Sequence, residues 1–163
     1  MEEEHFKLMD STTLSLKLQL EGDKLISFFN SLTDEEFSKE IYSDGELWKI
    51  KDVLAHLVSA EKNFLELFKN IKSIGGGSPE GFEINRFNNS QVKAMKTYKT
   101  SDLLTSFLKA RSKMSEWVAQ LNIEDLEIKG IHPAMGEVKL GEMIKMVYLH
   151  NIMHQRDIKE ILS

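Results

Sequence analysis

Apolar residues recur every three or four positions through long stretches without proline, and this spacing predicts helices. The 163 residues contain only two prolines, Pro79 and Pro133, and both lie in segments that look like loops. Four long periodic segments cover about residues 4–32, 50–71, 102–121 (with Ser101 as N-cap) and 140–162. We therefore predict an all-α fold, a four-helix bundle that forms a single domain over residues 1–163.

Shorter segments connect these helices. Residues 33–36, Thr-Asp-Glu-Glu, read as a capping box that opens one short turn. Residues 75–79, Gly-Gly-Gly-Ser-Pro, are the clearest break and indicate a flexible connection. Residues 82–95 are polar and irregular, so a short extra helix or an irregular segment is expected between the second and third long helices. Residues 138–140 could pair as a brief strand, but no sheet is expected.

Composition and charge exclude several classes of function. The chain has no cysteine, which excludes disulfides, iron–sulfur clusters, thiolate zinc sites and a cysteine nucleophile. Its net charge of −5 argues against a nucleic-acid partner, because binding to phosphates usually needs a basic surface. The acidic start gives no sign of a secretory signal, and no apolar run approaches the roughly 20 residues of a membrane span. A cytoplasmic protein with a small-molecule ligand, no nucleic-acid partner and no membrane partner is expected.

The last long segment carries the strongest chemical signal. Its apolar seam steps by three or four residues and includes two histidines: Leu140, Met143, Val147, His150, His154, Ile158 and Ile161. Residues at i and i+4 lie one turn apart on the same helix face, so one ion could meet both imidazoles. Buried histidines can also be hydrogen-bonded core residues, and the spacing alone leaves both interpretations open.

His56 is the candidate for a third ligand. It follows Val53 by three residues and precedes Ala60 by four, which places it on the inward side of the second long helix. Three imidazoles would leave at least one coordination position for water or substrate, as catalytic metal sites do. The predicted metal ligands are therefore His56, His150 and His154.

The remaining histidines and acids are expected in lesser roles. His5 and His132 are predicted to be solvated, although His132 could line the mouth of the site. Asp52 could orient the His56 ring, or it could simply be an acid favoured near a helix N-terminus. Glu61 and Asp157 are predicted to be solvated, with a proton-acceptor role open if either turns inward.

Trp48 and Trp117 are expected to be packing residues. No residue is assigned a catalytic or cofactor-binding role from the sequence.

Several short motifs together resemble the DinB/YfiT-like bundles. They are Trp48-x4-Val53-Leu54-Ala55-His56-Leu57, Asn85-Arg86-Phe87-Asn88, Gly136-Glu137-Val138-Lys139-Leu140 and His150-x3-His154-Gln155-Arg156-Asp157-Ile158. The resemblance implies a four-helix bundle with a histidine triad at His56, His150 and His154, and zinc, nickel or iron as the divalent metal. It also implies thiol-dependent relatives that use mycothiol or bacillithiol, and it makes a homodimer plausible.

Three interpretations of the function remain. The leading hypothesis is a metal-dependent enzyme acting on a small molecule, either a thiol-dependent transferase or a hydrolase, with a slight preference for thiol transfer by analogy. The alternative is a non-catalytic bundle that binds a metal or ligand. A third reading treats the histidines as structural and the bundle as an interaction module.

Overall fold

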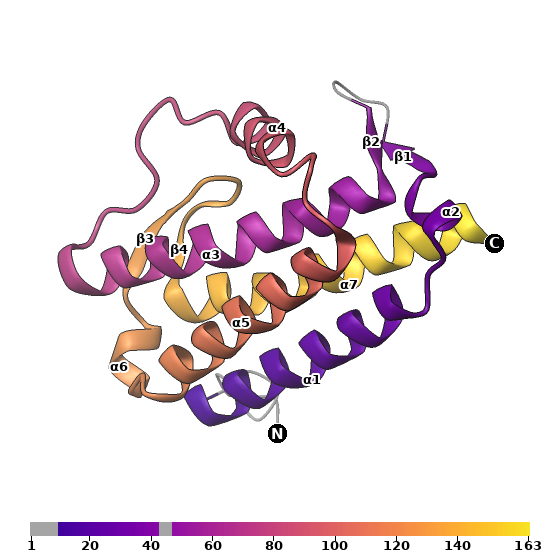
Figure 1. Ribbon diagram of the computed structural model, residues 1–163. Coiled ribbons are helices and arrows are strands. Elements are labelled where there is room, and N and C mark those ends of the chain that lie inside the picture. Colours follow the sequence, from indigo (N-terminus) through magenta and orange to yellow (C-terminus); the bar gives the residue numbers. More distant parts are fainter. Residues whose placement is uncertain (1–9, 43–46) are drawn as a thin grey trace.

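The computed structural model describes residues 10–42 and 47–163. Four long helices dominate it: α1 (Ser11–Asn30), α3 (Ile50–Ile74), α5 (Thr100–Ala119) and α7 (Leu140–Leu162). They lie side by side as a bundle, which confirms the predicted all-α fold class (Figure 1). The predicted start of the first helix and His5 lie outside the described residues.

The order of the helices around the bundle explains which side chains can meet. Helix α1 packs against α5 and α7, and α3 packs against the same two helices. The consecutive long helices α1 and α3 therefore occupy opposite corners (Figure 1). As a result α3 and α7, which carry the three candidate histidines, are neighbours.

Some helices of the described residues begin with a side-chain cap. Asp10 accepts a hydrogen bond from the backbone N–H of Thr13 at the start of α1. The short helix α2 (Asp34–Phe37) has the predicted capping box between Thr33 and Glu36. Helix α7 has the predicted bounds, whereas α5 begins at Thr100, so Ser101 lies inside the helix and is not its cap.

The connection after α3 contains helix α4 (Ile84–Ala94), which lies across α3 as expected for residues 82–95 (Figure 1). A further short helix, α6 (Ile123–Leu126), precedes the last hairpin. Helix α3 itself continues three residues beyond the predicted end and stops at Gly75, whose φ of 76° suits glycine.

Two small antiparallel hairpins are present, so the expectation that no sheet forms was wrong on this scale. Strand β1 (Glu40–Tyr42) pairs with β2 (Trp48–Lys49), and β3 (Lys129–His132) pairs with β4 (Gly136–Lys139). Residue Val138 does pair, opposite Gly130. Strands of two to four residues are too short to show a period-two pattern, so no clear sequence signal predicts them.

The glycine-rich segment after α3 is tied to strand β3, which corrects its interpretation as a flexible connection. The Ile131 N–H donates to the Gly76 carbonyl at 2.7 Å, and the Ser78 N–H donates to the Ile131 carbonyl at 2.8 Å. A Cβ on Gly77, whose φ is 129°, would lie 2.5 Å from the Ile131 carbonyl oxygen. Glycine is required there because the two backbones touch.

Gly22 has a comparable packing role in the middle of α1. A Cβ at this position would lie 3.0 Å from Cγ of Arg111, a buried side chain that crosses from α5. The helix continues through Gly22 without interruption. Glycine has a low helix propensity, but at position 22 its lack of a side chain makes room for the buried Arg111.

Candidate metal centre

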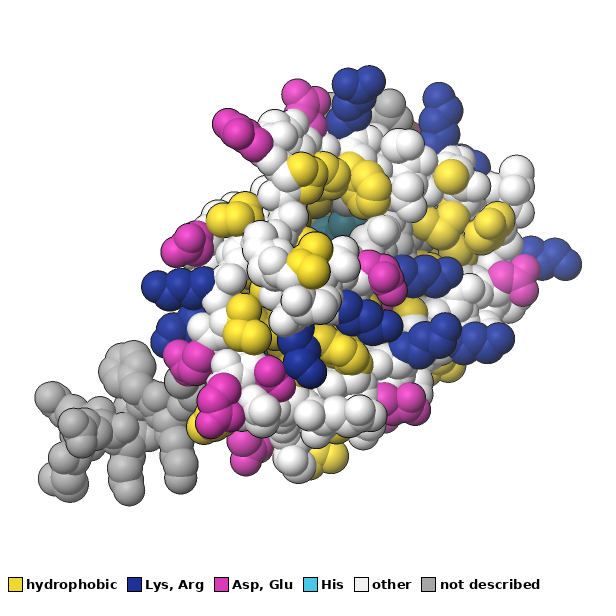
Figure 2. Space-filling view, turned by 90° about the vertical axis from the view of Figure 1, so that its left-hand side faces the viewer, with side chains coloured by type: hydrophobic (Ala, Val, Ile, Leu, Met, Phe, Trp, Pro, Cys, Tyr) yellow, Lys and Arg dark blue, Asp and Glu magenta, His cyan; other side chains and the backbone are white. Residues whose placement is uncertain are grey.

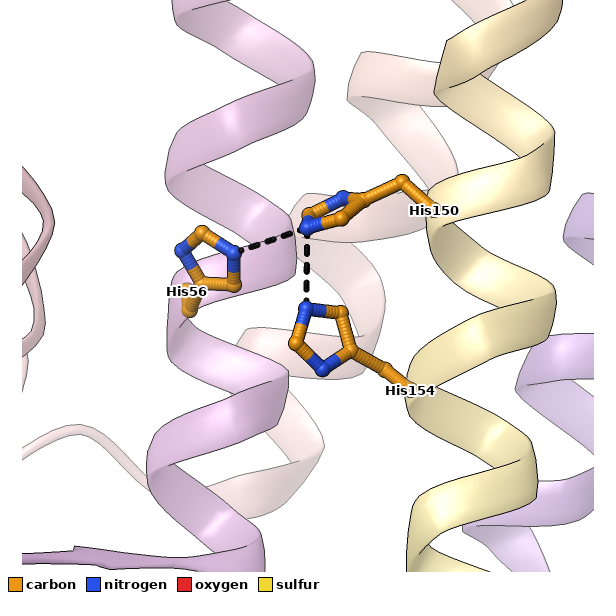
Figure 3. A group of neighbouring side chains, drawn as sticks. All are labelled: His56, His150 and His154. Atoms are coloured by element: carbon orange, nitrogen blue, oxygen red, sulfur yellow. Dashed lines mark hydrogen bonds between the residues drawn. The ribbon is translucent and has the colours of Figure 1, made fainter. Parts of the chain in front are cut away.

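Three histidines meet between α3 and α7. His56 projects from α3, and His150 and His154 project from successive turns of α7 into the same space (Figure 3). His150 Nε2 lies 3.2 Å from His56 Nε2 and 2.8 Å from His154 Nε2. One nitrogen from each ring falls within 4.8 Å of the other two. The structure therefore brings together the three residues that the spacing selected.

Hydrogen bonding outside the triad fixes the ring state of His154. The Tyr42 hydroxyl donates its only proton to Asp157 Oδ2 at 2.8 Å and lies 2.8 Å from His154 Nδ1. The hydroxyl oxygen must then accept from His154 Nδ1–H. This leaves a lone pair on His154 Nε2, directed at the other two rings, which is the tautomer that a metal ligand requires.

The triad cannot satisfy its own hydrogen-bonding groups. His150 Nε2 faces two nitrogens, but a neutral imidazole nitrogen carries either one proton or one lone pair. His56 Nδ1 is buried and has no hydrogen-bond partner among the described residues. Nitrogens bound tetrahedrally to zinc lie roughly 3.3 Å apart, given bonds of about 2.05 Å. The donor set and its spacing therefore fit a divalent cation, while ligation itself stays a prediction.

Burial keeps these rings uncharged. Desolvation, aided by the neighbouring His150, lowers the pKa of His56 to about 3. Desolvation, with a smaller effect of His132, lowers the pKa of His150 to about 4, and burial likewise lowers the pKa of His154. Neutral imidazole is the form that coordinates metals, so the environment selects the ligating state.

The surroundings of His56 correct one expectation for Asp52. Asp52 accepts from the backbone N–H of Lys49 at 2.8 Å and from Lys96 Nζ at 3.1 Å, so it caps α3 and does not orient the His56 ring. The ring centroid of Trp48 lies 5.2 Å from that of His56, and the indole N–H donates to Asn89. Trp48 is thus a packing residue that covers the histidine.

A cavity of about 460 Å³ adjoins the triad, and His56 and His150 form part of its lining. The remaining lining is mostly apolar, with Phe64, Phe82, Phe87, Met135, Met143 and Met146 among its residues. A space-filling view shows a hollow bordered by hydrophobic side chains, with a histidine at its base (Figure 2). The candidate metal centre therefore has an open side that could admit a small molecule.

Glu61 also lines this cavity, and the prediction that it is solvated was wrong. It is 2% exposed, and its two carboxylate oxygens accept from Arg111 Nε at 2.6 Å and Nη2 at 3.0 Å. Arg111 donates further to the Leu18 carbonyl and to Asn151 Oδ1. With both oxygens occupied, Glu61 is a poor candidate for a proton acceptor.

His132 is buried at 7% exposure, so its predicted solvation was wrong and the alternative, a place in the site lining, was right. Its ring stacks on Phe64 with the centroids 5.2 Å apart.

Asp157 was also predicted to be solvated, but it accepts a hydrogen bond from the Tyr42 hydroxyl.

Three residues of the site were missed from the sequence: Tyr42, Arg111 and Asn151. Tyr42 lies in a three-residue strand, and Arg111 and Asn151 are polar residues within amphipathic helices. Arg111 and Asn151 both had a usable signal. Arg111 falls four residues after Phe107 and three before Met114 on α5. Asn151 falls four residues after Val147 on α7.

Comparison with known proteins supports the family suggested by the motifs. The family model described as "DinB family" matches residues 7–161. Among solved structures, YfiT from Bacillus subtilis, described as a probable metal-dependent hydrolase with an unusual four-helix bundle topology, is 20% identical. Its TM-score is 0.75, and the match covers 92% of this chain and 84% of YfiT.

Two other structures have a similar fold. The mycothiol-dependent maleylpyruvate isomerase is 13% identical with a TM-score of 0.72, and the match covers 92% of this chain but only 61% of the isomerase. The colibactin self-resistance protein ClbS, solved in complex with double-stranded DNA, is 13% identical with a TM-score of 0.74 over 93% of this chain and 95% of ClbS. This fold alone therefore does not exclude a nucleic-acid partner, and the expectation drawn from net charge stays a prediction.

No protein with a curated function matches the chain by sequence. Over residues 10–42 and 47–163, no helix combines the length and apolar character needed to cross a bilayer. The match over residues 7–161 spans nearly the whole sequence and agrees with the bundle and the histidine triad. The chain belongs to the DinB family.

Proposed function

We propose that this protein is a metal-dependent enzyme that acts on a small molecule, with one divalent ion held by His56, His150 and His154. The observation that carries the proposal is the convergence of three imidazole nitrogens that lack enough hydrogen-bond partners, beside a cavity. Zinc, nickel and iron all suit imidazole ligands, and zinc is the first to test.

The reaction class is hydrolysis or thiol-dependent transfer. A divalent ion at the triad would supply Lewis acidity, which activates water or a thiol near neutral pH. A structure described as a probable metal-dependent hydrolase and one described as a mycothiol-dependent isomerase share this fold. A low-molecular-weight thiol such as mycothiol or bacillithiol is therefore a candidate co-substrate.

The residues of the chain contribute orientation and exclusion of water. Tyr42 and Asp157 hold the His154 ring with its lone pair toward the triad. Trp48 covers His56 on one side, and the apolar lining of the cavity surrounds the open side. Both carboxylate oxygens of Glu61 accept hydrogen bonds from Arg111, so this pair would stabilise the cavity wall and take no part in the reaction.

Metal analysis tests the ligand set. Wild-type protein is expected to carry about one equivalent of zinc, nickel or iron, and His150→Ala almost none. Leu149→Ala is the matched control, because it changes the neighbouring residue, which is 46% exposed and outside the triad. Equal and negligible metal in wild type and His150→Ala would refute the proposal.

Turnover assays then test catalysis. The zinc-loaded protein would be incubated with a panel of esters, and with electrophiles in the presence of mycothiol or bacillithiol. Hydrolysis without thiol supports a hydrolase, and consumption of thiol supports a transferase. Tight metal binding without turnover in either panel would favour the alternative of a non-catalytic metal-binding bundle.

We also propose a domain organisation, a location and an oligomeric state. The DinB unit would act as a single domain over residues 1–163, in the cytoplasm, as a homodimer. Size-exclusion chromatography with light scattering measures the oligomeric state directly.

A further inference from the structure

His132 occupies a place in the cavity that the metal centre does not explain. It ends strand β3 and lines the cavity together with His56 and His150. Its ring stacks on Phe64, which lies eight residues, or roughly 12 Å, beyond His56 along α3. A ligand that reaches from the triad along the cavity would meet this ring.

The protonation state of His132 is fixed by the turn that follows it. The backbone N–H groups of Ala134 and Met135 donate to His132 Nδ1 at 3.0 and 3.1 Å. A nitrogen that accepts these bonds carries a lone pair, so the proton of the neutral ring must lie on Nε2. Burial also lowers the pKa of His132, which favours the neutral ring.

The Nε2–H of this tautomer is available to a ligand. Among the described residues, no side chain or backbone group accepts a hydrogen bond from this N–H. The Nε2 atom is also not fully buried. The rest of the ring is held by Phe64 and by the two backbone amides. His132 is thus a fixed hydrogen-bond donor on the wall of the cavity.

The backbone around His132 is held equally firmly. Ile131, the residue before it, is hydrogen-bonded through its N–H to Gly76 and through its carbonyl to Ser78. Gly130 packs so closely on Ile71 that a Cβ would lie 2.7 Å from Cδ1 of that side chain. A donor held on both sides loses little entropy when a ligand binds.

The charge of the cavity limits what it can hold. No lysine or arginine is found among the described residues that line it. Its one carboxylate, Glu61, is neutralised by Arg111. Away from the triad the cavity therefore offers an apolar surface and no counter-charge for an anion.

We propose that the cavity binds a neutral, largely apolar substrate, and that His132 Nε2–H donates a hydrogen bond to a carbonyl or similar acceptor oxygen of that substrate. This assignment names the substrate class of the enzyme proposed above and so rests on that proposal. The binding step itself needs only the cavity and His132, so it can be tested without metal.

Three naphthalene probes of similar shape separate the contributions: 2-acetylnaphthalene, the hydrocarbon 2-isopropylnaphthalene and the anion 2-naphthoate. Their affinities for the full-length, metal-free protein would be measured by calorimetry. The ketone is expected to bind about fivefold to tenfold more tightly than the hydrocarbon, which is the usual gain from one hydrogen bond. The carboxylate is expected to bind more weakly than the ketone.

His132→Asn tests the donor itself. The asparagine oxygen can replace Nδ1 as acceptor for Ala134 and Met135, but the side chain has no group in the place of Nε2. This variant should lose the preference for the ketone and keep the wild-type affinity for the hydrocarbon. Asn88→Ala, which removes another polar group of the lining, should keep the preference for the ketone over the hydrocarbon.

Three results would overturn the inference: an unchanged ketone preference in His132→Asn, loss of that preference in Asn88→Ala, or tighter binding of the carboxylate than of the ketone. Equal loss of ketone and hydrocarbon binding in His132→Asn would also overturn it, since His132 would then only shape the wall. Repeating the titrations with zinc separates this proposal from the first one. A protein that never binds metal but shows the predicted pattern would refute the metal centre alone.

Discussion

Helices α3 and α7 share two buried polar clusters, and these clusters differ in how their members are paired. In the arginine cluster, each of the three guanidinium nitrogens of Arg111 has an acceptor, in Glu61, Leu18 and Asn151. In the histidine cluster, the three rings mainly face one another, and His56 Nδ1 has no hydrogen-bond partner within residues 10–42 and 47–163. The two clusters are close neighbours, because Asn151 directly follows His150.

This difference in pairing distinguishes a buried cluster that stabilises the fold from one that we propose to bind a ligand. Opposite charges with complementary hydrogen bonds need nothing from outside, so the arginine cluster can hold the helices together by itself. Three imidazoles that converge do not complete one another's hydrogen bonds, and the cation that we propose would accept one lone pair from each of them. Burial alone would have ranked both clusters equally, whereas the pairing tells them apart.

Breaking the arginine cluster should give the largest effect. Arg111→Met leaves the Glu61 carboxylate buried and unpaired, so the free energy of unfolding should fall by about 3–5 kcal/mol. Urea denaturation of the metal-free protein measures this change. Arg111→Met combined with Glu61→Leu should recover much of the loss, and the cluster is not structural if the single variant is as stable as wild type.

A surface ion pair provides the control for that experiment. Lys139 Nζ lies 2.6 Å from Glu127 Oε2, but both side chains are about two-fifths exposed (41% and 40%). Lys139→Ala should therefore lower the free energy of unfolding by less than about 1 kcal/mol. A larger change would mean that the distance between charges, and not their burial, sets the strength of these pairs.

Mild acid should destabilise the metal-free protein, because of the three buried histidines. Burial lowers the pKa of His56 to about 3 and that of His150 to about 4, and it lowers the pKa of His154 as well. Below the ordinary value of about 6.5 the unfolded chain binds protons that the folded protein excludes, so stability is lost as the pH falls. From pH 7.5 to 6 the metal-free protein should lose about 2 kcal/mol in total.

Urea denaturation at both pH values measures this loss. A variant with leucine at positions 56, 150 and 154 should be nearly insensitive to pH over the same range, apart from a small contribution of His132. If the triple variant keeps the full pH dependence, the titrating groups lie elsewhere.

Tyr42→Phe should weaken metal binding without unfolding the protein. It removes the hydroxyl that accepts from His154 Nδ1–H, so the ring is free to turn or to change tautomer. The zinc dissociation constant should rise about tenfold or more, as it does when a ligand loses its outer hydrogen bond. Competition with a fluorescent chelator gives the constant, and wild-type affinity in this variant would contradict the orienting role.

The smallest change is expected when a histidine of the triad is replaced by an apolar residue. In metal-free protein, His56→Leu removes a ring with an unpaired buried nitrogen, so the free energy of unfolding should change by less than about 1 kcal/mol. The same variant should lose the stabilisation that zinc gives to wild type. If His56→Leu destabilised the metal-free protein as much as Arg111→Met does, the histidines would serve mainly to stabilise the core.

The long helices and the triad could be predicted because their signal is periodic. Helix α7 keeps steps of three and four over its whole length, and its two histidines replace apolar residues within that seam. His56 occupies an equivalent position on α3. Family motifs at these positions agree with the same reading, and only the helix boundaries needed small corrections.

The rest depends on contacts between distant residues. Charged residues such as Arg111 and Glu61 are usually solvated, and nothing near either one in the sequence shows that they pair with each other in the core. The strands that place Tyr42 and His132 have only three and four residues. Such elements form because of what they pack against, which a local pattern does not contain.

The cavity has walls of two different origins. His56, His150 and the core side chains of the lining come from α3 and α7, whereas residues 77–88 and 132–135, which include His132, come from connections between the long helices. Mutations in those connections can reshape the space offered to a substrate while the bundle and its three imidazoles stay in place. Substrate recognition can in this way change independently of the three histidines.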